Sequence, residues 1–329
     1  MDKIIGLGNA LIDVLATLKD DTLLDELELP KGSMQLIDDA KLQQINTKFS
    51  QMKTHLATGG SAGNAILGLA CLGAGTGFIG KVGNDHYGDF FRKNLQKNNI
   101  EDNLLTSEQL PSGVASTFIS QDGERTFGTY LGAAASLKAE DLTLEMFKGY
   151  AYLFIEGYLV QDHEMILHAI ELAKEAGLQI CLDMASYNIV ENDLEFFSLL
   201  INKYVDIVFA NEEEAKAFTG EEPEEALRVI AKKCSIAIVK VGANGSYIRK
   251  GTEEIKVSAI PVEKVLDTTG AGDYFAAGFL YGLTCGYSLE KCAKIGSILS
   301  GNVIQVIGTT ISPEPVSYTH LTLPTILLV

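Results

Sequence analysis

Cysteine and positive charge are both scarce in this chain. The five cysteines, at positions 71, 181, 234, 285 and 292, form no Cys-x-x-Cys pair and no cluster with histidine at zinc-ligand spacing. We therefore expect no zinc site and a reduced, cytoplasmic protein. With 26 basic against 43 acidic residues, the net charge is −17, which repels nucleic acid and anionic lipid surfaces. A small-molecule ligand becomes the expectation, with no nucleic-acid or membrane partner.

Sequence signals for membranes, secretion and standard nucleotide loops are also missing. The uncharged run over residues 56–80 contains eight glycines and a polar centre, which fit a loop, a helix and a strand better than a membrane span. Asp2 and Asp13 interrupt the N-terminal apolar residues, so we expect no signal peptide. No Gly-x4-Gly-Lys-Ser/Thr motif occurs, which excludes a standard P-loop ATPase.

Apolar residues are plentiful: 47% of the 329 residues are hydrophobic, enough for the continuous core of a large α/β domain. Short apolar runs alternate with helical patterns, which predicts a mostly parallel sheet flanked by helices. The predicted strands are Ile4–Leu7, Gly77–Gly80, Tyr152–Ile155, Ile180–Asp183, Ile207–Ala210 and Ala237–Val241. The predicted helices are Ala62–Leu72, Tyr87–Asn98, Glu164–Ala176, Glu212–Thr219, Glu222–Lys232, Ala271–Leu283 and Leu289–Ile307.

Residues 113–131 have a different pattern. β-Branched and aromatic residues surround the turn Gln121-Asp122-Gly123-Glu124, which predicts a hairpin over Gly113–Ser120 and Arg125–Leu131. With Lys31–Ile37 it would form a small sheet outside the main one. We expect a lid formed from about 14–37 and 107–131, lying over the carboxyl edge of the main sheet, so that residues 1–315 make one domain.

The C-terminal end does not match the rest of the chain. Residues 316–329 contain no Asp, Glu, Lys or Arg and no helix caps, and they resemble the read-through translation of a sequencing-library adapter. We expect this segment to be a non-native tail. The alternative is an ordinary C-terminal strand.

The junction Asp267-Thr268-Thr269-Gly270-Ala271-Gly272-Asp273 precedes an apolar segment with the spacing of a buried helix. Small residues at 270–272 let backbone approach a ligand, and the first amides of a helix lack internal partners. These amides and the helix dipole favour an anion such as phosphate. Asp273, in the first turn, would accept a proton from an attacking hydroxyl. The alternative is a turn followed by an acidic first helical residue.

The segment Thr58-Gly59-Gly60-Ser61-Ala62-Gly63-Asn64 places paired glycines before a helix. The Asn64 amide both donates and accepts, which suits vicinal sugar hydroxyls. Gly59, Ser61 and Gly63 also match the nucleophile elbow of α/β hydrolases. An elbow needs a strand directly before it, whereas residues 51–58 are polar, so a hydrolase is the minor alternative.

Other polar residues follow predicted strands. Asp13, in an apolar stretch, would bind two hydroxyls, or would be a surface residue on an edge strand. Asn211 and Glu214 have the spacing of a helix-capping pair, or would hold water around Mg²⁺. The turn from Lys240 to Ser246 would either contact a nucleotide or form a simple hairpin. Arg125 would either contact the transferring phosphate or lie in solvent. A polyanion such as ATP in so acidic a protein requires a divalent cation, and we expect Mg²⁺.

In this order, the segments resemble the ribokinase-like or PfkB family of carbohydrate and nucleoside kinases, over about residues 3–315. The family's two signatures are recognisable in residues 59–64 and 267–273. The resemblance implies a three-layer sandwich with a central, mostly parallel sheet and a small β-sheet lid. It implies Asp273 as the base, with the amides of Gly270, Ala271 and Gly272 as the anion hole.

The resemblance also implies roles for other residues. Those that would bind the acceptor are Asp13, Gly59, Gly60 and Asn64, with Asn9 nearby. Arg125 is a further candidate for substrate binding because of its place at the edge of the predicted lid, not because of the resemblance. Those that would bind ATP are Asn211, Glu214, Lys240, Gly242, Gly245 and Asn302, with Asn211 and Glu214 organising Mg²⁺ through water. Several family members bind a monovalent cation in the region of Asp267 and Thr269, so potassium activation is an expectation.

Residues 124–134 and 303–305 look like those of the adenosine-kinase-like branch, although fructokinase- and ribokinase-like branches share much of them. We therefore expect ATP-dependent phosphorylation of the hydroxymethyl group of a nucleoside or furanose sugar, with an adenosine-like acceptor slightly favoured over a free sugar. A catalytically silent sugar or nucleotide sensor on the same fold is the alternative of another class. The acceptor, and the choice between monomer and homodimer, stay open.

Overall fold

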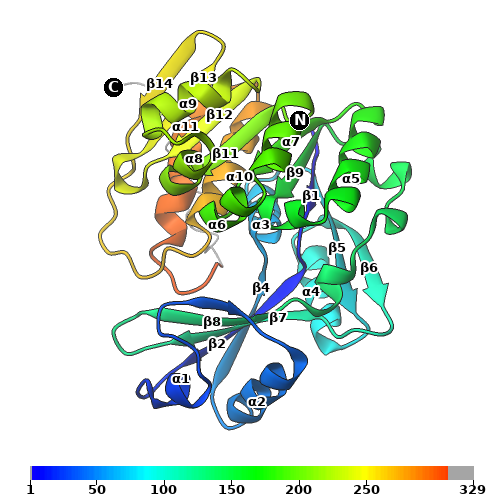
Figure 1. The fold of residues 1–329 in the computed structure, drawn as a ribbon, viewed down its shortest axis with the longest axis vertical. Helices are drawn as coiled ribbons and strands as arrows, with labels where there is room; N and C mark the ends of the chain where they lie inside the picture. Colours follow the sequence, from blue (N-terminus) through cyan, green and yellow to red (C-terminus); the bar gives the residue numbers. More distant parts are fainter. Residues whose placement is uncertain (1, 310–329) are drawn as a thin grey trace.

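Two sheets organise the chain in the computed structural model, which describes residues 2–309 (Figure 1). A nine-stranded sheet lies between two layers of helices, and a five-stranded sheet extends from one end of this body. The fold class expected from the sequence is therefore confirmed. The prediction of a non-native tail over 316–329 lies outside the described residues.

The main sheet has the strand order β14-β13-β12-β11-β10-β9-β1-β5-β6. Its strands from β12 to β6 are parallel, and β13 and β14 add antiparallel strands at one edge. The strands are β1 (Ile4–Leu7), β5 (Thr76–Gly83), β6 (Ile100–Ser107), β9 (Tyr152–Glu156), β10 (Gln179–Asp183), β11 (Ile207–Asn211), β12 (Ile236–Lys240), β13 (Ser246–Lys250) and β14 (Glu253–Val257). The sequence prediction found the inner strands and missed β6, β13 and β14.

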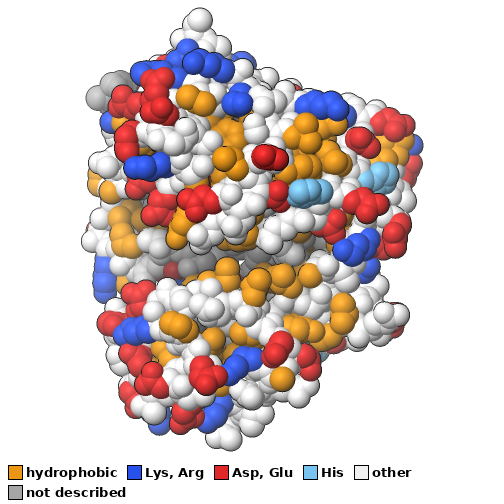
Figure 2. Space-filling model, viewed as in Figure 1, with side chains coloured by type: hydrophobic (Ala, Val, Ile, Leu, Met, Phe, Trp, Pro, Cys, Tyr) orange, Lys and Arg blue, Asp and Glu red, His pale blue; other side chains and the backbone are white. Residues whose placement is uncertain are grey.

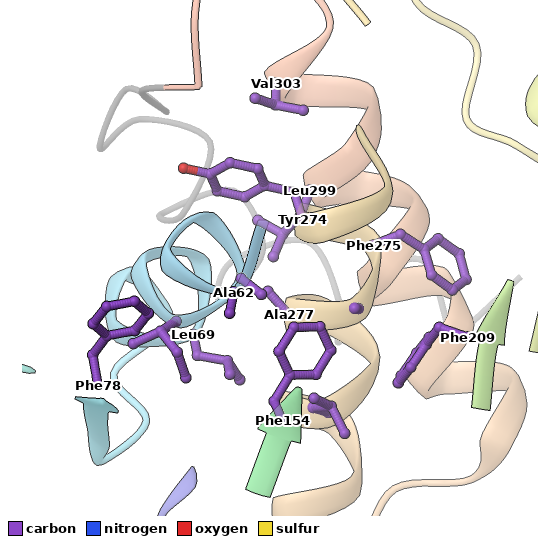
Figure 3. Packing of buried hydrophobic residues seen from close by; sticks show 14 of the residues in the cluster. Ala62, Leu69, Phe78, Phe154, Phe209, Tyr274, Phe275, Ala277, Leu299 and Val303 are labelled. Atoms are coloured by element: carbon purple, nitrogen blue, oxygen red, sulfur yellow. The ribbon is translucent and has the colours of Figure 1, made fainter. Parts of the chain in front are cut away.

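Each main-sheet strand except β14 contributes residues to two separate cores, one on either face of the sheet. On β9, Phe154 packs toward α3, α10 and α11, whereas Leu153 and Ile155 pack toward α5 and α7. Figure 3 shows Phe154 and Phe209 meeting α10 and α11, with Tyr274 directed toward α3. The helices are α1 (Thr22–Glu26), α2 (Asp39–Phe49), α3 (Ser61–Cys71), α4 (His86–Lys97), α5 (His163–Glu175), α6 (Tyr187–Asn192), α7 (Leu194–Lys203), α8 (Glu212–Thr219), α9 (Pro223–Ala231), α10 (Ala271–Thr284) and α11 (Leu289–Val303).

The last described helix is shorter than predicted. We expected it to reach Ile307, but α11 ends at Val303. The Ile304 carbonyl instead accepts hydrogen bonds from the amides of Leu266 and Asp267, so this end of the helix holds the loop before α10 in place. Within residues 2–309, no helix combines the length and hydrophobicity needed to cross a bilayer.

The small sheet has the order β3-β8-β7-β2-β4 and carries α1 and α2 on one side (Figure 1). Its strands are β2 (Leu11–Thr17), β3 (Met34–Leu36), β4 (Thr54–Gly59), β7 (Gly113–Ile119) and β8 (Arg125–Tyr130). The predicted hairpin is β7 and β8, but the sheet also includes β4, beyond the predicted lid segments. Because only the last two residues of β4 are buried, its sequence is polar and was wrongly excluded as a strand.

Two predictions change as a result. A strand does precede Gly60, so our reason for rejecting a hydrolase elbow was wrong. That strand belongs to the small antiparallel sheet, however, and not to a central parallel sheet as an elbow requires. Asp13 lies on β2, between β4 and β7, and is therefore not on an edge strand.

Candidate active site

A cavity of about 1010 Å³ opens where the small sheet faces the carboxyl ends of the main-sheet strands. Figure 2 shows the hollow between the two parts of the molecule. Strands β10, β11 and β12 end at its wall with Asp183, Asn211 and Lys240, and the first turn of α10 forms the adjoining wall. Asp13 and Phe127 reach it from the small sheet. Ligands of open α/β sheets bind at this edge.

Most of the predicted site residues meet in this one cavity. Those lining it are Asp13, Gly60, Asn64, Asn211, Glu214, Lys240, Gly242, Gly245, Thr269, Gly270, Ala271, Gly272 and Asp273. The predicted residues that lie outside the described lining are Asn9, Gly59, Arg125, Asp267 and Asn302. On α11 the lining consists of Ser297, Ser300 and Gly301, and Ile304 follows the end of the helix, whereas Asn302 lies on a different face.

Asp273 is held by two side chains of α3. Ser61 Oγ donates to its Oδ1 at 2.7 Å, and Asn64 Nδ2 donates to its Oδ2 at 2.9 Å. Burial raises the pKa of Asp273 to about 6, against these two hydrogen bonds, which lower it. A carboxylate with this pKa is ionised at neutral pH and is well placed to accept a proton.

The start of α10 follows a tight turn that requires glycine. Gly270 has φ +76° and ψ −2°, as at the third residue of a type II turn. The Ala271 amide closes this turn by donating to the Thr268 carbonyl at 3.1 Å. The prediction that the Ala271 amide belongs to the anion hole is therefore wrong, because this amide is hydrogen-bonded within the turn. Within residues 2–309, the amides of Gly270 and Gly272 have no protein acceptor.

Paired glycines let β4 and the start of α3 approach their neighbours. A Cβ at Gly60, where φ is +87°, would lie 2.1 Å from the Asn9 carbonyl oxygen. A Cβ at Gly59 would lie 2.4 Å from Asp13 Oδ1, so Gly59 leaves room for this carboxylate.

Burial raises the pKa of Asp13 to about 7, although Arg125 lowers it. Asn64 Oδ1 is buried with no partner among the described residues, which leaves an acceptor for a ligand hydroxyl.

Glu156, at the end of β9, was missed by the sequence analysis. Its Oε1 accepts from the Asn9 side chain at 2.6 Å and from the Asn9 amide at 2.9 Å, and its Oε2 accepts from the Ala62 amide at 2.9 Å. The Asn9 side chain that we expected to bind an acceptor is thus engaged by Glu156. A lone acid directly after a buried apolar strand was the available signal.

At the other end of the cavity, the capping alternative for Asn211 and Glu214 is confirmed. Asn211 Oδ1 accepts from the Glu214 amide at 2.8 Å, while Glu214 accepts from the Asn211 amide at 2.7 Å. Burial raises the pKa of Glu214 to about 7, against the nearby Lys240 ammonium, which lowers it. The described residues contain no cluster of three or more His, Cys, Asp or Glu that would hold a metal directly.

Asp267 connects three segments instead of facing the cavity. Its Oδ1 accepts from the Thr269 amide at 3.0 Å, and its Oδ2 accepts from the Gly308 amide at 2.8 Å. The Arg125 guanidinium lies 2.7 Å from the same Oδ2 as an ion pair, without hydrogen-bond alignment. In this structure, Arg125 therefore neutralises the carboxylate that we expected to bind a monovalent cation.

Known proteins resemble the chain in sequence and in structure. Residues 32–316 match the pfkB family of carbohydrate kinases. Adenosine kinase 2 of Arabidopsis thaliana is 26% identical over 338 residues, covering 95% of this chain and 96% of the relative. A probable sugar kinase from Rhizobium etli CFN 42 has a TM-score of 0.87 and 34% identity, covering 99% of both chains. Adenosine kinase from Sinorhizobium meliloti has a TM-score of 0.86 and 33% identity, covering 98% of this chain and 99% of that one.

Proposed function

The chain belongs to the pfkB family of carbohydrate kinases, and we propose that within this family it uses ATP to phosphorylate the hydroxymethyl group of a nucleoside, with Asp273 as the base. One observation carries the proposal. Asp273 lies in the first turn of α10, in the cavity wall, beside the amides of Gly270 and Gly272, which have no acceptor among the described residues. A proton acceptor and an anion site thus adjoin each other.

In the proposed reaction, Asp13, Gly60 and the unpaired Asn64 Oδ1 orient the acceptor's ring hydroxyls. The hydroxymethyl oxygen attacks the γ-phosphorus while the bond from that phosphorus to the bridging oxygen breaks, and ADP leaves. Asp273 takes the hydroxyl proton. The amides of Gly270 and Gly272 stabilise negative charge on the phosphoryl oxygens. Gly242, Gly245 and the α11 residues that line the cavity would bind the remainder of ATP.

Magnesium fits the site as a hydrated ion. With no cluster of direct ligands in residues 2–309, Asn211, Glu214 and Asp183 would hold it through water, as Mg²⁺ permits. It would supply charge neutralisation on the phosphates. Potassium fits poorly because Arg125 already neutralises Asp267, so we assign no monovalent cation.

The inner face of the small sheet favours a nucleoside over a free sugar. Strand register places Leu36 opposite Thr129, Thr129 opposite Ala115, and Ala115 opposite Asp13, so these side chains share the face of Asp13. Met34 lies opposite Phe127, which lines the cavity. Met34 and Leu36 are 51% and 65% exposed, an apolar surface that a purine base would cover and a free sugar would not reach.

Acceptor screening tests the proposal. We expect ADP release to be fastest with adenosine, slower with inosine, and lowest with ribose, fructose and 2-keto-3-deoxygluconate. Fastest turnover with a free sugar would establish the sugar-kinase alternative. Tight binding of one compound without turnover of any would establish the sensor.

Phe127 is the residue on which we expect the acceptor preference to depend. Phe127→Ala should lower kcat/KM for adenosine by about 10- to 100-fold, since stacking of a base on an aromatic ring contributes roughly 1–3 kcal/mol. Turnover of ribose should change less than about 3-fold. Tyr287→Ala, which removes a ring exposed between α10 and α11, is the control and should change neither value. Equal losses for nucleoside and sugar would contradict a base-binding role.

A further inference from the structure

Lys240 is the one cationic side chain among the described residues that line the cavity. Six carboxylates line the same cavity: Asp13, Asp183, Glu212, Glu213, Glu214 and Asp273. A polyphosphate entering this space would meet strong repulsion, and Mg²⁺ is bound there only through water in the proposed function. We therefore expect the negatively charged phosphates to bind next to the Lys240 ammonium.

The Lys240 ammonium lies next to the anion site. Its Nζ is 2.9 Å from Asp183 Oδ2, and the Lys240 side chain is only 15% exposed. A Cβ built on Gly272 would lie 2.9 Å from the same nitrogen, so the ammonium borders the first turn of α10. Strand β12 and the Asp183 ion pair hold this side chain next to the Gly272 amide, which has no hydrogen-bond acceptor among the described residues.

The Lys240 ammonium lies between the Asp183 carboxylate and the first turn of α10. The amino end of a helix carries partial positive charge, which repels a cation. The Asp183 carboxylate, 2.9 Å from the ammonium nitrogen, stabilises the charged form of Lys240. Lys240 thus remains charged, and a phosphoryl group at the helix would relieve the repulsion by bridging the ammonium and the amides.

We propose that Lys240 is a catalytic residue, whose ammonium hydrogen-bonds the transferring γ-phosphoryl group beside the Gly270 and Gly272 amides, while Asp183 fixes its position. This inference rests on the proposed kinase function. The chemical step is unchanged: the acceptor oxygen bonds to phosphorus, the bond to the bridging oxygen breaks, and Asp273 takes the proton. Lys240 keeps its own protons and stabilises charge on the phosphoryl oxygens through the transfer.

The test compares Lys240→Met and Lys240→Arg with Lys174→Met. Lys174 forms an ion pair of 2.6 Å with Asp206, which directly precedes β11 at the opposite end of the sheet, so it controls for the loss of a lysine–aspartate pair. The measurements are kcat and KM for adenosine, together with equilibrium binding of ATP and ADP by calorimetry. Wild-type turnover is measured first, because its absence would overturn the kinase proposal and not this one.

We expect Lys240→Met to lower kcat by about 10²-fold, the scale for losing one preorganised charge donor. ATP should bind about 10-fold more weakly, ADP within 2-fold of wild type, and KM for adenosine should stay within 3-fold. Lys240→Arg should recover part of kcat, and Lys174→Met should match wild type. Normal kcat in folded Lys240→Met, or equal weakening of ATP and ADP, would overturn the assignment.

Removing Lys240 alone leaves Asp183 buried and unpaired, which can prevent folding. The double variant Lys240→Met with Asp183→Asn avoids that unpaired charge. Its kcat is compared with that of Asp183→Asn alone, in which Lys240 remains. A further loss of about 10²-fold in the double variant supports the proposal, whereas equal kcat values for the two refute it.

Discussion

An Asp273→Asn variant is expected to lose about 10²-fold or more of kcat, within the range of general acid–base catalysis, while keeping its fold and most of its ATP affinity. The asparagine side chain has nearly the same shape but cannot accept the proton of the attacking hydroxyl. Ser61 and Asn64 can still pair with it, since the Ser61 hydroxyl can turn to accept from the new amide while Asn64 Nδ2 donates to its oxygen. Packing around α10 should therefore survive.

Coupled ADP release measures kcat, calorimetry measures ATP binding, and thermal melting reports the fold. Asp89→Asn is the matched control because Asp89 also lies in the first turn of a helix, α4, but is exposed and outside the cavity. We expect the control to retain wild-type kcat. Near-normal turnover of Asp273→Asn would remove Asp273 from its proposed role.

The pH dependence of kcat/KM gives a second readout of the same group. Burial raises the pKa of Asp273 to about 6, and only the carboxylate accepts a proton. Activity should therefore fall as the pH drops through about 6, with the Asp273-dependent part of the profile missing in Asp273→Asn. Bound phosphate and Mg²⁺ change the electrostatic potential at Asp273 and therefore its pKa. The pH profile of kcat, which reports the substrate complex, is therefore measured separately from that of kcat/KM, which reports the free enzyme.

Much of the main sheet could be predicted from the sequence because its strands are buried on both faces. β1 and β11 are continuous apolar runs, which the sequence shows directly. β4 and β6 could not be found in this way, since each has several exposed residues and no strong alternation. The partner strands that stabilise them are distant in sequence, and a local pattern does not contain that information.

The positions of Gly270 and Asp273 in the cavity wall could be predicted from residue type and spacing. The site was not predictable where partners are chosen by tertiary packing. The Ala271 amide is used by a turn, the Asp267 carboxylate by Arg125, and the Asn9 side chain by Glu156. Each of these competing partners becomes visible only once the segments are placed in three dimensions.

Asp13→Asn should raise KM for the acceptor by about 10²-fold or more and at the same time stabilise the free protein above neutral pH. Hydrogen bonds from two hydroxyls to a carboxylate each contribute roughly 1.5–3 kcal/mol, and an amide accepts from both less well. Asp102→Asn, which removes a β6 carboxylate paired with Arg92 outside the cavity, is the control. It should leave KM unchanged and give no stabilisation.

The stability gain follows from the raised pKa of Asp13, which burial takes from 3.8 to about 7. A carboxyl group whose folded pKa is raised contributes stability below its unfolded pKa, and that contribution is lost as the pH rises through about 7. At pH 8 the buried charge costs on the order of 2 kcal/mol, allowing for solvent at the cavity, and asparagine removes this cost. At pH 5 the cost is smaller, because the folded group is still mostly protonated while the unfolded group is ionised, so the two melting temperatures should differ less than at pH 8.

Thermal melting at pH 5 and pH 8, without ligand, therefore separates two explanations for a high KM in Asp13→Asn. If Asp13 is a binding group held at a cost in stability, the variant melts about 3 °C above wild type at pH 8 and by a smaller margin at pH 5. If Asp13 instead supports the small sheet, the variant melts lower at both pH values and its high KM reflects a damaged small sheet. KM of the wild type should also rise as the pH falls below about 7, because the acceptor requires the carboxylate. A flat KM between pH 8 and pH 6, together with a lower melting temperature at pH 8, would exclude the binding role.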